Sequence, residues 1–243
     1  MPFQCCSSRG VIRLVLAGCA LIGFGFTIHY NLQRFHLQRV HQELNDRVGL
    51  LKIDDPKQVA VMGIPFLPEE IPPGVQKAHV WKFRVYCPSK FDGRSRTYRG
   101  LIRPDSPYSA GGSSGGLFGG GNQEPEEITS MVSMVKSDGQ WTICYRQGGG
   151  SSSFSASDEL GLDDINELLV EPIVEPGQTR VFNVNEAICL FRIRHKEEAV
   201  DRSGKPQPGL YQGFAAYLFS QQIEQPFDDW AKGNIETLEE ALR

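Results

Sequence analysis

The sequence has few of the residues and motifs that carry metal or cofactor chemistry. It contains six cysteines and five histidines among 243 residues, and no two cysteines stand in Cys-x-x-Cys spacing. The formal net charge of −4 is too small to indicate nucleic acid as a global partner. No Asn-x-Ser/Thr glycosylation acceptor occurs in the chain. We therefore expect no cofactor, no metal site and no nucleic-acid partner.

The cysteines also do not form a disulfide framework. Three lie near the N-terminus, and the other three, Cys87, Cys144 and Cys189, are widely spaced in the rest of the chain. Three cysteines cannot all pair with one another. Two interpretations stay open, namely small buried apolar residues in strands or one disulfide in an oxidising compartment.

Long hydrophobic runs are scarce, and the one that exists is Leu14–Ile28, which has no charged residue. As a helix it would be about 22 Å long, shorter than the roughly 30 Å hydrocarbon core of a bilayer. Val11 before the run and Tyr30 after it extend the apolar segment. The pattern predicts a signal-anchor: a tail at residues 1–13 and a single transmembrane helix at residues 14–32 that contacts the lipid bilayer.

Three alternatives to the anchor stay open. The segment has the basic flank of a cleavable signal peptide, although no Ala-x-Ala site follows it. Leu16–Cys19 resembles the box that precedes a lipidated cysteine, and a fully buried helix of a soluble protein is the third alternative. Lys and Arg are nearly equal in number before and after the run, so they do not decide the orientation of the anchor in the membrane. We therefore base that orientation on the lengths of the two flanking segments. A short tail stays in the cytoplasm, and the long C-terminal part becomes extracytoplasmic.

Residues 33–55 are predicted to form a helical stalk. Apolar residues recur three or four positions apart on one stripe, and the helix ends before Pro56. These stripe residues are Leu37, Val40, Leu44, Val48 and Leu51. Residues 37–51 span only two heptads, so both a coiled-coil homodimer and a single helix stay open.

From Val59 onward the hydrophobic period changes to two, which is typical of half-buried strands. The expected strands are His79–Cys87, Thr97–Arg103, Ile128–Lys136, Trp141–Arg146, Thr179–Val184, Ala187–Arg194 and Gly213–Ser220. The last two are apolar on both faces and should lie centrally. The fold class is therefore mainly β: residues 57–243 should form an antiparallel β-sandwich or barrel-like soluble domain with a short C-terminal helix.

Helices and loops complete the domain. Asp158–Leu169 and Asn234–Leu242 are the helical candidates. Residues 109–121 and 148–153 consist almost entirely of Gly and Ser, and we expect them to be flexible loops. On this view, replacing Gly111–Gly121 by a short linker should change the melting temperature little.

Catalytic motifs are weak. Gly-x-Ser-x-Gly occurs twice, at Gly111–Gly115 and Gly112–Gly116, but a nucleophile elbow needs a strand before it, a helix after it and a later histidine. His195 is the one histidine that follows, and no helical pattern follows the loop. An acidic stretch starting at Asp158 offers oxygen ligands for Ca²⁺ without EF-hand spacing. We expect no enzyme activity and no catalytic or metal-binding residues.

The most suggestive feature is a separation of charge. Seven basic residues lie between Lys82 and Arg103, and an acidic segment follows at residues 158–175. Lys82, Arg84, Arg99 and Arg103 should lie on the outward faces of two neighbouring strands. Such a patch suits an anionic headgroup or polymer. The alternative is a solvated sheet face.

These features predict a single-pass membrane protein that displays a non-enzymatic binding or assembly module. Its partner would be a protein or an anionic polymer. Two alternatives stay open: a membrane-anchored, hydrolase-like enzyme with its site in the long loops, and a structural stalk protein that dimerises through residues 37–51.

Overall fold

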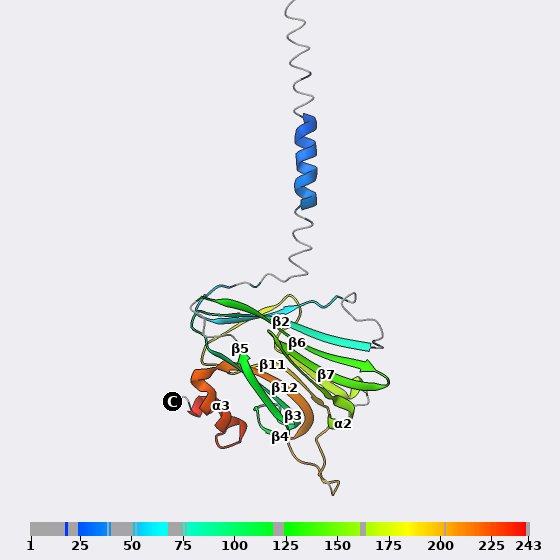
Figure 1. The fold of residues 1–243 in the computed structure, drawn as a ribbon, viewed down its shortest axis with the longest axis vertical. Coiled ribbons are helices and arrows are strands. Elements are labelled where there is room, and N and C mark those ends of the chain that lie inside the picture. The colour runs from blue at the N-terminus through cyan, green and yellow to red at the C-terminus, as the bar shows by residue number, and fades with distance from the viewer. Residues whose placement is uncertain are drawn as a thin grey trace, which may run out of the picture. The chain divides into compact units, whose positions relative to one another are not determined.

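The structure, a computed structural model, describes residues 18, 24–37, 39, 51, 53–67, 75, 77–118, 124–160, 164–201 and 203–241. The chain divides into two units, Met1–Val48 and Gly49–Arg243. In the first unit, residues 24–37 are helical (Figure 1). Residues 14–17 and 19–23 of the expected anchor, and most of the expected stalk, lie outside the described residues.

The described helix of the first unit has large apolar side chains along its whole length. Seven of them are exposed, from Phe24 to Leu37. Across the part of the chain that the structure describes, no helix combines the length and the hydropathy needed to cross a bilayer.

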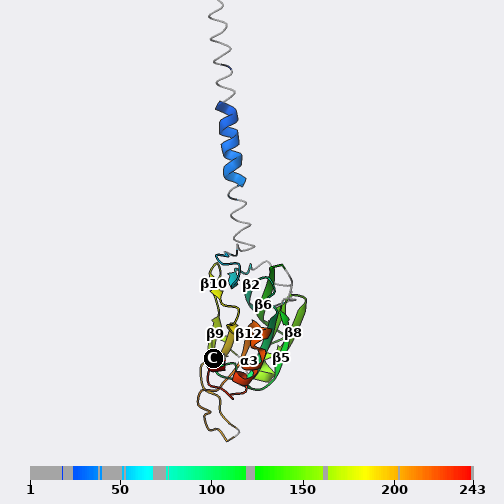
Figure 2. The ribbon, with the colours of Figure 1, turned by 90° about the vertical axis from the view of Figure 1, so that its left-hand side faces the viewer.

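The second unit contains two antiparallel six-stranded sheets, as the period-two pattern predicts (Figures 1 and 2). The first sheet has the order β10 (Thr179–Phe182), β1 (Val59–Ile64), β2 (Lys77–Cys87), β6 (Glu126–Ser137), β7 (Gln140–Gln147), β8 (Gly150–Ser155). The second has the order β4 (Ser109–Ala110), β3 (Gly93–Ile102), β12 (Tyr211–Ser220), β11 (Ile188–His195), β9 (Leu168–Pro172), and β5 (Ser113–Phe118) also pairs with β3.

The main core lies between the two sheets. Phe83 and Val85 of β2 and Phe191 and Ile193 of β11 are all fully buried in it, and Trp81 packs against it. The alternation of apolar and polar residues in β2 therefore correctly identifies its inner face. The ring centroids of Trp81 and Phe191 are 4.8 Å apart.

The hairpin between β6 and β7 turns on an Asp-Gly sequence. Asp138 and Gly139 connect the two strands and have φ angles of 50° and 83°. Positive φ at both central residues matches the right-handed twist of the flanking strands, and Asp-Gly is a preferred sequence there.

Strand β11 contains a β-bulge. Cys189 pairs with Tyr217 and Phe191 pairs with Ala216, so Leu190 is an extra residue in the ladder. Leu190 and Phe191 both belong to the main core as a result. Four consecutive residues, Ile188–Phe191, are therefore apolar for two reasons. The bulge places both Leu190 and Phe191 in the main core, and Cys189 packs against the second apolar cluster on the outer face.

The outer face of the second sheet is covered by α3 (Glu224–Ala231), which follows the 3₁₀ turn η3 (Gln221–Ile223). Phe227 of α3 is buried in a second apolar cluster against Tyr98 of β3 and Phe219 of β12. Arg96 on β3 forms ion pairs with Glu224 at 2.9 Å and with Asp228 at 3.5 Å. This layer explains why β12 is apolar on both faces, and it confirms that β12 is central.

The expected helices are shorter than the sequence pattern suggests. In place of one helix at Asp158–Leu169, the structure has α2 (Ala156–Leu160), the 3₁₀ turn η2 (Ile165–Glu167) and the first two residues of β9. The Asp164 carboxylate caps η2 by accepting from the backbone N–H of Asn166 at 3.0 Å. Toward the C-terminus, α4 covers Leu238–Ala241 of the expected Asn234–Leu242.

The two Gly/Ser stretches differ most from expectation. They were expected to be loops, but β4 and β5 lie within residues 109–121 and β8 overlaps residues 148–153. Each strand is fixed by a ladder to a longer partner, β5 to β3 and β8 to β7. Each also carries an aromatic residue into the main core, Phe118 and Phe154. Strand pairing and these two buried rings therefore stabilise segments whose other side chains bury little apolar surface.

Candidate functional site: a groove between two Gly/Ser edge strands

The predicted basic patch is divided between the two sheets. Lys82 and Arg84 lie on β2 of the first sheet, whereas Arg99 lies on β3 of the second. The expectation that β2 and β3 are neighbours is therefore wrong: β2 pairs with β1 and β6, and β3 pairs with β12, β4 and β5.

Each of the four basic residues also has its own local partner. Arg84 forms an ion pair with Glu127 at 3.5 Å. The other three lie over aromatic rings, Lys82 over Phe66, Arg99 over Phe154 and Arg103 over Tyr108. The four residues are therefore divided between two sheets, and the surface for an anionic polymer stays a prediction.

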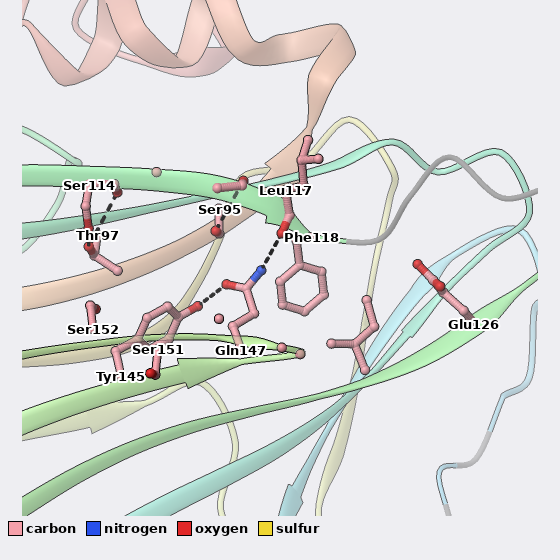
Figure 3. A pocket seen from close by; sticks show the side chains of 16 residues that line it. Ser95, Thr97, Ser114, Leu117, Phe118, Glu126, Tyr145, Gln147, Ser151 and Ser152 are labelled. Atoms are coloured by element: carbon pink, nitrogen blue, oxygen red, sulfur yellow. Dashed lines mark hydrogen bonds between the residues drawn. The ribbon is translucent and has the colours of Figure 1, made fainter.

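The structure instead brings the two Gly/Ser stretches together at one groove. One wall is β5 with its partner β3, and the other is the hairpin of β7 and β8 with the start of β6 (Figure 3). The cavity volume is about 660 Å³. This lies within the range of about 300–1,000 Å³ that is usual for ligand sites.

The groove is lined mainly by small uncharged residues. Glycines and serines come from both walls, for example Ser114 and Gly116 of β5 and Ser151 and Ser152 of β8. Among the described residues that line it, Glu126 is the one with a charged side chain. The lining therefore offers hydroxyl and backbone groups for hydrogen bonding and does not create a strong electrostatic field.

A chain of hydrogen bonds crosses the groove from one sheet to the other. The Tyr145 hydroxyl donates to Gln147 Oε1 at 2.6 Å, and Gln147 Nε2 donates to the backbone oxygen of Leu117 in β5 at 3.1 Å (Figure 3). Burial raises the pKa of Tyr145 to about 12, so its hydroxyl stays protonated and donates at neutral pH. This chain fixes Gln147 in an orientation that points its amide at the edge of β5.

The serines of the Gly-x-Ser-x-Gly matches do not form a nucleophile elbow. Both lie within strand β5, and Ser114 Oγ shares a hydrogen bond of 2.6 Å with Thr97 Oγ1. None of the described histidines lines the groove: His195 contacts the backbone oxygen of Leu160, and His79 stacks on Trp81. The geometry thus supplies no general base to either serine.

The three described cysteines are free thiols. Burial, with a smaller contribution from Glu126, raises the pKa of Cys87 to about 12, and burial also raises the pKa of Cys144 and Cys189. Raised values disfavour the thiolate, so these cysteines are poor nucleophiles and metal ligands. No group of three potential metal ligands occurs among the residues that the structure describes.

No family model, no curated protein and no solved structure matches this chain. The groove is therefore the feature from which a function can be inferred. Sequence reasoning did not find the groove, because it took the two Gly/Ser stretches as independent loops. The available signal was an aromatic residue in or next to each stretch, Phe118 within the first and Phe154 directly after the second.

Proposed function

We propose that the chain is a membrane-anchored, non-enzymatic binding module whose groove between β5 and β8 takes an uncharged ligand outside the cytoplasm. The observation that carries this proposal is a groove with one charged side chain, Glu126, in its lining and the Tyr145–Gln147–Leu117 hydrogen-bond chain across it. Its polar groups fix the orientation of a bound molecule, and no nucleophile and base are paired in it.

The membrane anchor is part of the same proposal. Leu14–Ile28 has no charge, and the described helix at residues 24–37, which overlaps its end, exposes apolar rings such as Phe26 and Phe35. Apolar side chains on all sides of a helix are costly in water and favourable in hydrocarbon. An anchor at residues 14–32 would hold the second unit at the membrane surface.

Site-specific cross-linking in cells tests the groove. A photoreactive phenylalanine at Ser151 of the full chain should give a defined adduct, because Ser151 lines the groove. The same residue at Val181, on the edge strand β10, is the matched control. The adduct should disappear when Gly116→Leu fills the groove. Identical adducts from both positions, or none from Ser151, would contradict the proposal.

Membrane extraction tests the anchor. The full chain should resist alkaline carbonate, and Ile22→Arg should reduce insertion at a cost of about 2.5–3.5 kcal/mol. N-terminal sequencing of the extracted protein separates the alternatives: a chain that begins at Cys19 is a lipoprotein, and one that begins near Tyr30 has lost its anchor. Protease added to intact cells should digest the second unit if that unit is extracytoplasmic.

A further inference from the structure

The edge strands of the two sheets differ in how they are protected. Exposed edges attract further strands, and proteins usually block them with charges, prolines or short length. Three edges here follow that rule: β10 carries Arg180, β9 carries Glu171 and Pro172, and β4 has two residues. The remaining edges, β5 (SSGGLF) and β8 (GSSSFS), carry no charge and no proline. These two unprotected edges line the same groove.

The backbone of β5 presents hydrogen-bonding groups to the groove. The backbone oxygen of Leu117 faces it, because Gln147 Nε2 reaches that oxygen from the opposite wall. N–H and C=O groups of alternate residues in a strand point to the same side, so those of Gly115 and Ser113 share this edge. The alternate set points to β3, as the bond from Arg99 N–H to the Gly112 oxygen shows.

Gln147 already occupies one of these positions with an amide. Its side-chain N–H₂ donates to Leu117 O at 3.1 Å, as the backbone N–H of an added strand would. Rotation of the Gln147 side chain would free that oxygen, so an incoming peptide N–H would replace one amide hydrogen bond with another.

The glycines of the groove leave room that the protein's own packing does not use. A Cβ at Gly116 would have Ser95 Oγ as its nearest neighbour, at 3.8 Å, and a Cβ at Gly149 would meet nothing within 4 Å. Neither residue has a positive φ. Gly115 differs, because a Cβ there would lie 2.6 Å from Arg96 Nη1. Glycine within a strand weakens it and often marks a close approach of another backbone.

We propose that the groove binds an extended, uncharged peptide segment of a partner protein, which adds as an antiparallel or parallel strand to the free edge of β5. This inference rests on the binding function proposed above. Main-chain hydrogen bonds to alternate residues of β5 supply affinity, and side chains that face Gly116 and Ser114 must be small. The scarcity of charge in the lining disfavours charged side chains at those positions, since burial would desolvate them.

Peptide selection and a backbone scan test the proposal. A phage library of random peptides about 12 residues long, twice the length of β5, is selected on the full chain in lipid nanodiscs. Peptides that also bind the Gly116→Leu variant are removed. The best peptide is then synthesised with each backbone nitrogen methylated in turn. Because methylation removes one main-chain donor, we expect affinity to fall about ten-fold at every second position and little between them.

Variants and alternative outcomes make the test decisive. Gly116→Leu, which the selection uses to define groove-dependent peptides, should leave the melting temperature close to that of the wild type, so that its loss of binding is not a loss of folding. Ser153→Leu introduces the same leucine side chain at an exposed position of β8 that does not line the groove. This variant should bind the peptide as the wild type does.

Several results would overturn the inference. If peptide binding depends on Gly116 but methylation shows no period of two, strand addition is excluded and the groove is left as a binding site of another kind. Failure to select any peptide sensitive to Gly116→Leu would remove the peptide as occupant. A dimer of the full chain that Gly116→Leu dissociates would make a second copy the occupant.

Discussion

Phe227→Ala should destabilise the domain strongly, although α3 is only a two-turn helix on its surface. The Phe227 side chain is 0% exposed. Its ring stacks on Phe219 with 4.0 Å between centroids and lies 5.6 Å from Tyr217 and 6.2 Å from Trp230. Truncation to alanine removes the centre of the second apolar cluster and the main apolar attachment of α3 to the sheet.

The magnitude follows from two contributions. Burying a phenylalanine side chain is worth about 1.5–3 kcal/mol, and each aromatic pair adds about 0.5–1.5 kcal/mol. Large-to-small changes of this kind cost about 3–5 kcal/mol in closed cores. Because α3 forms an outer layer, it can shift inward and partly fill the space. We therefore expect a loss of about 3 kcal/mol in the free energy of unfolding, at the lower end of that range.

Urea denaturation of the full chain in detergent micelles measures this loss, with far-ultraviolet circular dichroism as one signal and tryptophan fluorescence as the other. Trp230 contacts Phe227 and reports on α3 directly. Val200→Ala is the control, because Val200 is 61% exposed and its truncation should change stability by less than about 0.5 kcal/mol. A loss below about 1 kcal/mol in Phe227→Ala would show that α3 does not depend on this cluster.

Three other predictions follow from the same structure. Replacing Gly111–Gly121 by a four-residue linker removes β5 and buried Phe118. We expect the free energy of unfolding to fall by about 3 kcal/mol, which corresponds to a melting temperature lower by about 6–12 °C. An unchanged melting temperature would mean that β5 is dispensable. Burial raises the pKa of both Tyr98 and Tyr145 to about 12 from 10.0, so the stability they provide is complete below pH 10 and is lost as pH rises through 12. The part of the phenolate absorbance that a Tyr98→Phe, Tyr145→Phe double variant lacks should therefore appear together with alkaline unfolding, and its appearance before unfolding would contradict the burial. Arg96→Ala removes an ion-pair partner of two partly exposed carboxylates, of which Glu224 keeps Arg94, and should cost about 1 kcal/mol at low salt and less at high salt. A loss that does not change with salt would indicate packing and not charge as its cause.

The sequence predicts the regular strands well, because their burial is one-sided. In β2, Phe83 and Val85 alternate with polar residues, and this period of two alone indicates the inner face. The turn residues Asp138 and Gly139 likewise predict the hairpin from local geometry. Such features depend on neighbours in sequence, and they are visible without knowledge of the sheet order.

The groove and the basic residues depend on sheet order, which the local pattern does not contain. Lys82 and Arg99 were placed together because consecutive strands usually pair. Here the chain crosses from one sheet to the other between β2 and β3. The Gly/Ser strands depend on pairing with β3 and β7, so their own composition predicts loops. Helix α3 was missed because Pro226 interrupts a short apolar pattern, although proline is tolerated in a first helical turn.

The bulge in β11 affects which changes of chain length the second sheet can accept. Removing one residue from a regular strand transfers every later side chain to the opposite face. In β11 the deletion of Leu190 would instead restore an unbroken alternation, with Phe191 and Ile193 still inside and Arg192 still outside. The loss would be confined to one core side chain. Position 190 is therefore a place where homologous chains can differ in length by one residue and keep the same inner and outer faces.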